Sequence, residues 1–145
     1  MTKLNGHPVY KVSDFINHSD KHLAVIISRG WMKPNNYRVY KDFYLSDHRS
    51  NEYFFDVGFV SDGGTFPIWL SPFLRYNGKG MAAFLIHDLW CYQANKSGMY
   101  HERAHGDSML RGHLEDCHVS EFLAKAAGSS VKRYGEYLKS SGKLK

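Results

Sequence analysis

The pattern of hydrophobic and polar residues changes character near the middle of the chain. Residues 37–45 (YRVYKDFYL) alternate between apolar and polar side chains, as a strand with one buried face does. The apolar positions share one side of that strand: Tyr37, Val39, Phe43 and Leu45. Residues 22–28 (HLAVIIS) and 52–60 (EYFFDVGFV) are rich in strand-forming residues and predict two further strands. Residues 61–67 (SDGGTFP) then interrupt the pattern as a breaker cluster.

The second half of the chain has helical character. Residues 80–94 (GMAAFLIHDLWCYQA) are apolar nearly all round, which predicts a buried helix. Two more helices are expected over residues 101–117 and 121–139, with Ser120 as the N-cap of the last one. Strands followed by helices indicate an α+β fold, in which N-terminal antiparallel strands pack against a C-terminal three-helix unit.

Composition narrows the class of protein. A chain of 145 residues, 43% of them hydrophobic, predicts a single folded domain that is strand-rich over 1–66 and helical over 67–140, with a basic tail at 141–145. The start of the chain has no apolar signal-peptide core, and the longest apolar run is too short to span a bilayer. Two cysteines make no disulfide framework, so we expect a soluble protein that folds in a reducing cytoplasm. The net charge of +5 is scattered except near the C-terminus, and gives no specific nucleic-acid signal.

Two ionisable residues, His87 and Asp88, interrupt the most apolar helix. Asp107 likewise lies on the apolar stripe of the next helix, which also contains Ala104, Leu110 and Leu114. Burial of such groups is costly without partners. Since a short break favours antiparallel helices, we expect Asp107 to face His87 and to leave one imidazole nitrogen free as a base. A satisfied structural pair is the alternative interpretation.

The breaker cluster carries chemistry of its own. Asp62 precedes Gly63 and Gly64, so the carboxylate and the backbone carbonyls supply oxygen ligands of the kind that Ca²⁺ prefers. The same glycines supply N–H groups that would suit an oxyanion. A plain turn after a strand is the alternative.

Three stretches together resemble a known family. GFVSDGGTFP, IHDLWCY and RAHGD match, in order and type, a family of small phage and prophage proteins, domain of unknown function 1353. The resemblance covers roughly residues 55–115. It implies a phage or prophage origin, and with it a place in the host cytoplasm or in a virion, without an established activity. It also marks Thr65, Tyr92 and Arg103 as supporting residues.

The chain departs from that family's pattern at three positions. Cys91 occupies the place of the family's tyrosine and Tyr92 follows it, Gly106 stands where alanine is favoured, and Ile68 stands where arginine is common.

A weaker resemblance is to the small calcium-dependent secreted phospholipases. It rests on a helix with His-Asp followed by Cys-Tyr, an upstream glycine-rich loop and an aspartate on a second helix. It implies that His87 activates water, that Asp107 orients His87, and that Asp88 binds Ca²⁺ together with loop carbonyls such as that of Gly64. The chain lacks the disulfides and the C-x-G-x-G loop of those enzymes, so the likeness is one of site geometry.

Residues 101–105 (HERAH) have the spacing of a zinc metallopeptidase motif. His101 would lie on the first turn of its helix, after a loop, and both histidines fall away from the apolar stripe. A third ligand is conceivable at His113 or Glu115. Zn²⁺ is therefore less expected than Ca²⁺, and surface or capping histidines are the preferred interpretation.

These observations favour a phage-encoded hydrolase that cleaves an ester or amide with metal assistance. A phospholipid or a cell-envelope component is the expected substrate. One alternative is a non-enzymatic virion component (tail or baseplate) or an accessory protein that contacts other phage proteins, with the same residues forming a buried network. The other is a zinc metallopeptidase.

Overall fold

The computed structural model describes residues 2–27, 36–61 and 79–145, and places their strands in two sheets. One sheet has the order β1 (Lys3–Leu4), β2 (His7–Lys11), β5 (Phe43–Ser46) and β6 (Glu52–Phe55). The other has the order β3 (Leu23–Ile27), β4 (Asn36–Val39) and β7 (Val60–Ser61). Two short 3₁₀ helices, η1 (Phe15–Asn17) and η2 (Ser19–Lys21), link β2 to β3.

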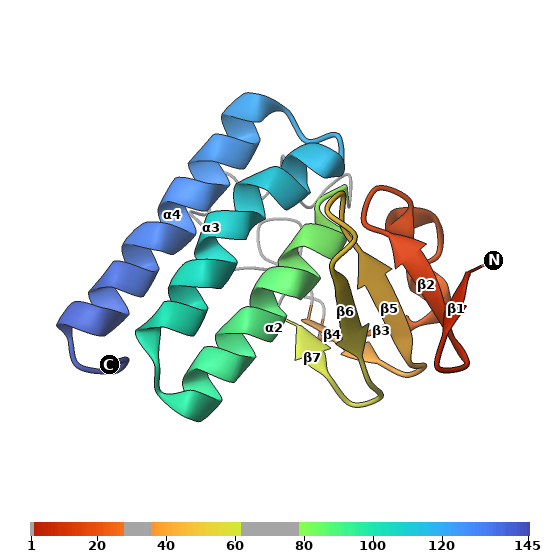
Figure 1. The fold of residues 1–145 in the computed structure, drawn as a ribbon, viewed down its shortest axis with the longest axis horizontal. Helices are drawn as coiled ribbons and strands as arrows, with labels where there is room; N and C mark the ends of the chain where they lie inside the picture. The colour runs from red at the N-terminus through yellow and green to blue at the C-terminus, as the bar shows by residue number, and fades with distance from the viewer. Residues whose placement is uncertain (1, 28–35, 62–78) are drawn as a thin grey trace.

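Three helices make up the C-terminal half: α2 (Met81–Ser97), α3 (Tyr100–Asp116) and α4 (Glu121–Ser140). In Figure 1, α3 lies between α2 and α4, and α2 is the helix nearest the strands. Gly98 ends α2 at a φ of 74°, in the left-handed region that glycine adopts without strain. Ser120 caps α4, because its Oγ accepts the N–H of Leu123 at 3.3 Å. The predicted α+β class, the three helices and this N-cap are confirmed.

The strand prediction needs three corrections. The segments 37–45 and 52–60 each form two short strands that belong to different sheets, so the chain crosses between sheets at 40–42 and again at 56–59. Asp42 joins the two crossings by accepting the N–H of Val57 at 2.7 Å. The strands β1 and β2 were not predicted. The pair β2–β5 is parallel, which the long connection between them permits.

The core forms where β5, β6 and η1 meet α2. Phe43 stacks between Phe15 and Phe55, with ring centroids 4.9 and 5.2 Å apart. The predicted inward positions Val39, Phe43 and Leu45 are all buried. In α2 only residues 82–87 and Ala94 are buried, so the prediction of a helix buried all round holds for its first half alone.

No helix in the described parts of the chain combines the length and the apolar character that a bilayer crossing needs.

Candidate functional site

The site lies between the first half of α2 and the middle of α3. His87 Nε2 is 2.6 Å from Asp107 Oδ1, and each residue is 3% exposed. The predicted approach of these two residues is therefore present. It arises because α2 and α3 run antiparallel and place these two polar residues opposite one another in a largely apolar contact region.

Arg103 completes the buried polar cluster. Its Nε lies 3.0 Å from Asp107 Oδ1 and 3.3 Å from Oδ2, and its Nη2 donates to the carbonyl of Val131 on α4 at 3.4 Å. The guanidinium also lies 5.4 Å from the ring centre of Tyr134. The Asp107 carboxylate thus has a charged partner one helical turn away on α3, which offsets the cost of burying the carboxylate.

Helix α4 approaches the cluster through a glycine. A Cβ at Gly135 would lie 2.5 Å from Asp107 Oδ2 and 3.3 Å from Arg103 Cγ. A side chain at this position would therefore displace the carboxylate or the guanidinium, and Gly135 is part of what shapes the site.

The hydrogen bond to Asp107 selects the tautomer of His87. An ionised carboxylate accepts only, so in a neutral ring Nε2 is the nitrogen that carries the proton and Nδ1 the one that keeps its lone pair. Cys91 Sγ lies 3.7 Å from Nδ1 and 3.8 Å from Nε2. Since these distances are nearly equal, the sulfur lies against the ring rather than in line with either nitrogen.

His87 opens onto a cavity of about 290 Å³, which we call the His87 cavity. Its lining comes from all three helices and the C-terminal tail, and includes Asp88, Cys91, Tyr134 and Lys143. The candidate base and the candidate cation ligand therefore face the same space. Cations and an aromatic ring lie beside them.

Asp88 lies at the end of a strand as well as on α2. Its Oδ2 accepts a hydrogen bond from the hydroxyl of Ser61, the last residue of β7. Because Asp62 follows Ser61 in the chain, Asp88 lies beside the point where the glycine-rich stretch begins. Asp62, Gly64 and Thr65 themselves lie outside the described residues.

Tyr92 is not brought to the site. It is 57% exposed and meets the ring of Phe59 edge-on, with centroids 6.3 Å apart. Cys91, one position earlier, lies nearer to His87, so the shift of the tyrosine by one residue turns it to the outer face of α2.

The HERAH stretch lies in the first turns of α3, and of its residues Arg103 is buried. His101 and His105 are both exposed, and His105 meets the edge of Trp90 with centroids 4.6 Å apart. Nowhere in residues 2–27, 36–61 and 79–145 do three or more His, Cys, Asp or Glu side chains gather as a metal site would require.

Gly106, which departs from the family's alanine, lies against Trp90 of α2. A Cβ there would overlap the Cβ of Trp90. The glycine is therefore matched to the tryptophan on α2.

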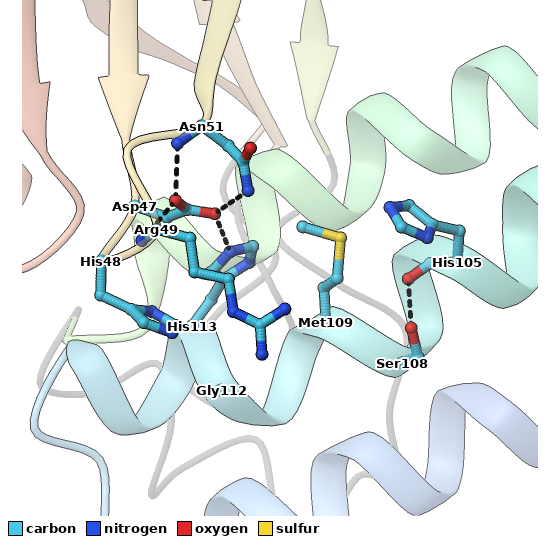
Figure 2. Close-up of a pocket in the computed structure, with 9 residues that line it drawn as sticks. All are labelled: Asp47, His48, Arg49, Asn51, His105, Ser108, Met109, Gly112 and His113. Atoms are coloured by element: carbon cyan, nitrogen blue, oxygen red, sulfur yellow. Dashed lines mark hydrogen bonds and ion pairs between the residues drawn. The ribbon is translucent and has the colours of Figure 1, made fainter.

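A second buried His–Asp pair was not predicted. His113 Nε2 lies 3.1 Å from Asp47 Oδ2, and both side chains are almost fully buried. Asp47 also accepts N–H groups from Arg49 and Asn51, as Figure 2 shows. The pair joins the turn between β5 and β6 to α3. The two residues are 66 positions apart in the sequence, so no local pattern links them. The turn sequence SDHRSN does favour hydrogen bonds between its aspartate side chain and the backbone.

The environment of this second pair shifts both pKa values. Burial alone would raise the pKa of Asp47, but the hydrogen bonds from His113, Asn51 and Arg49 outweigh it and hold the pKa below its ordinary value. Burial lowers the pKa of His113, against the opposing effect of Asp47. With its oxygens occupied by donors, this pair has the character of a structural lock.

Comparison with protein-family models finds a match over much of the chain. The family model described as protein of unknown function DUF1353 matches residues 37–131, which is more than half of the chain. Neither a curated protein nor a solved structure matches.

Proposed function

The chain belongs to the DUF1353 family, and for this member we propose a hydrolase that cleaves an ester or amide with a water molecule activated by His87. The observation that carries the proposal is the buried His87–Asp107 pair at 2.6 Å, whose histidine lines a cavity. A buried ionisable pair at the wall of a cavity is what general-base catalysis requires.

Each residue of the pair has one task in this mechanism. His87 Nδ1 takes a proton from a water in the His87 cavity, and the resulting hydroxide attacks the carbonyl carbon of the substrate. Asp107 holds the Nε2–H tautomer and stabilises the imidazolium that forms. Arg103 fixes the Asp107 carboxylate through Nε, so the carboxylate cannot turn away from the ring. The imidazolium returns its proton to the leaving group.

Asp88 is the residue that would hold a hard cation. It lines the His87 cavity, and the bond from Ser61 brings it to the start of the stretch with Asp62 and Gly64. Oxygen donors of this kind suit Ca²⁺. A bound Ca²⁺ would polarise the carbonyl of the substrate. These roles of His87, Asp107 and Asp88 are those that the resemblance to calcium-dependent phospholipases implies. We therefore infer that the substrate is a phospholipid or a cell-envelope component and that the protein is phage-encoded.

A second function is favoured by a separate observation. The same molecule contains the His113–Asp47 pair, which acts as a lock between a turn and a helix. Arg103 likewise ties α3 to α4 through the Val131 carbonyl. By this reading His87, Asp107 and Arg103 brace the three helices of a non-enzymatic virion or accessory protein.

The deciding experiment compares hydrolysis by the parent protein and two variants. The substrates are phospholipid vesicles, a chromogenic ester and peptidoglycan, each with Ca²⁺ and with chelator. We expect the parent to hydrolyse one class, and His87→Gln to lose at least about a hundredfold in rate, as loss of a general base does. His113→Gln, a matched change in the other buried pair, should keep the activity. An inactive parent on all three substrates would leave the brace as the function.

A further inference from the structure

The face of α3 that points away from Asp107 borders a second cavity, of about 360 Å³. We call it the Arg49 cavity. Figure 2 shows that the turn between β5 and β6 forms one wall, and that α3 forms the other through residues including His105, Met109 and Gly112. These α3 positions lie roughly opposite Arg103 and Asp107 on the helix, so the cavity is separate from the proposed active site.

Asp47, the buried carboxylate of this cavity, already has hydrogen-bond donors at both oxygens. Asp47 Oδ1 accepts the backbone N–H groups of Arg49 and Asn51 at 3.0 and 2.9 Å. Its Oδ2 accepts from Asn51 Nδ2 at 3.1 Å and from His113 Nε2 at 3.1 Å. These hydrogen bonds fix the conformation of the turn. The turn in turn places Arg49 at the cavity.

The basic side chains of the cavity include Arg49, His48 and His105. No carboxylate among the described residues lies within ion-pair distance of the Arg49 guanidinium, which Figure 2 shows extending from the turn toward α3. His48 Nδ1 lies 2.7 Å from Asp116 Oδ2, so its Nε2 donates to a ligand when the ring carries both protons. His105 contributes a further exposed ring from α3.

His105 packs against Trp90 on α2, with ring centroids 4.6 Å apart, which positions that histidine ring at the wall of the cavity. The cavity thus has an arginine and histidine rings on several sides, and both oxygens of Asp47, the one carboxylate among its lining residues, accept N–H groups.

We propose that the Arg49 cavity binds a small molecule through a phosphate monoester group. A guanidinium pairs with two oxygens of a phosphate, and the histidines reach a tetrahedral oxyanion from other directions. A carboxylate offers two oxygens in one plane and a single charge, and so uses fewer of these donors. The cavity volume lies within the range of small-molecule sites, so there is room for a group attached to the phosphate.

Two substitutions test the site without touching the proposed active site. Arg49→Gln removes the unpaired cation. Gly112→Glu places a carboxylate in the cavity, and the backbone tolerates it because a Cβ at Gly112 meets nothing within 4 Å. Arg133→Gln, at an exposed arginine of α4, is the control with the same charge change.

The measurement is isothermal titration calorimetry of the full chain with inorganic phosphate, with glycerol 3-phosphate and with acetate, at one ionic strength. We expect saturable binding of both phosphates, weakened roughly tenfold or more by Arg49→Gln and by Gly112→Glu and unchanged by Arg133→Gln. The melting temperature of each variant without ligand shows that it is folded. Chemical-shift changes of the parent should cluster at residues 47–51 and 105–113.

Three outcomes would overturn the proposal. They are the absence of phosphate binding by the parent, equal binding of acetate, and equal loss in Arg133→Gln, which would indicate unspecific attraction. Since His87→Gln should bind phosphate as the parent does, the result stands apart from the fate of the hydrolase proposal.

Discussion

Asp107 Oδ1 accepts from His87 Nε2 at 2.6 Å while the same oxygen also lies 3.0 Å from Arg103 Nε. Asp107 therefore contacts two polar side chains, whereas His87 bonds to one buried acceptor and otherwise lines a cavity. Removal of His87 leaves the ion pair of Asp107 and Arg103 intact. Removal of the carboxylate leaves a buried guanidinium without its charge partner.

This asymmetry predicts different stabilities for two variants. Asp107→Asn should lower the free energy of unfolding by about 3 kcal/mol or more, as the loss of one partner of a buried pair does. His87→Gln should cost under about 1 kcal/mol if the residue is a base, because catalytic groups are seldom optimal for stability. Urea denaturation of both variants measures the difference. A loss of about 1–3 kcal/mol in His87→Gln, together with an inactive parent, would favour the structural brace.

Two glycines of α4 should respond to alanine with opposite signs. Gly135→Ala places a Cβ 2.5 Å from Asp107 Oδ2, so we expect it to cost about 1–3 kcal/mol and to reduce activity. Gly128→Ala meets Arg111 Cβ only at 3.4 Å, an ordinary contact, and should gain up to about 1 kcal/mol from helix propensity. The melting temperatures of Gly135→Ala and Gly128→Ala, each compared with the parent, measure these effects. Equal shifts in the same direction would show that α4 does not shape the site through Gly135.

The fold was predictable where local pattern decides. The helices, the cap at Ser120 and the inward positions Val39, Phe43 and Leu45 follow from periodicity and side-chain type. The division of residues 37–45 between two sheets could not be predicted, because apolar and polar residues alternate in the same phase before and after the crossing at 40–42. What divides it is the pairing of β4 with β7 and of β5 with β6, which periodicity does not encode.

The candidate site was predictable where helical spacing and burial conflict. Asp107 stands out on an apolar stripe and His87 in an apolar run, so their contact could be inferred. Asp47 and His113 carry no such signal, since Asp47 lies in a polar turn where an aspartate is expected. Tyr92 lies one residue beyond the place of the family's tyrosine, and a step of one residue rotates a helical side chain by about 100°.

Calcium binding gives a direct test of Asp88. If Asp88 and the adjoining glycine-rich stretch hold Ca²⁺, the melting temperature should rise with Ca²⁺ concentration, because a ligand stabilises the state that binds it. Asp88→Asn should abolish the rise and keep the size of the side chain. Asp116→Asn, at a carboxylate on the far end of α3, is the control. An equal rise in all three proteins would place the calcium effect elsewhere.

The His113–Asp47 pair predicts how stability depends on pH. Burial holds the pKa of His113 below its ordinary value of 6.5, and burial also lowers the pKa of His22, which bonds Tyr10 and the Lys41 carbonyl. The unfolded chain then binds protons more readily, so the free energy of unfolding should fall as the pH drops below about 6.5.

The pKa of Asp47 lies below its ordinary value of 3.8, so its contribution is present above that pH and is lost on further acidification, through the folded-state value. Urea denaturation between pH 8 and pH 5 isolates the histidine part. His113→Gln should flatten the slope of stability against pH, whereas His101→Gln, at an exposed histidine, should not. Stability that rises toward pH 5, or equal slopes in the parent and His113→Gln, would contradict the assignment of His113 as a buried, neutral partner of Asp47.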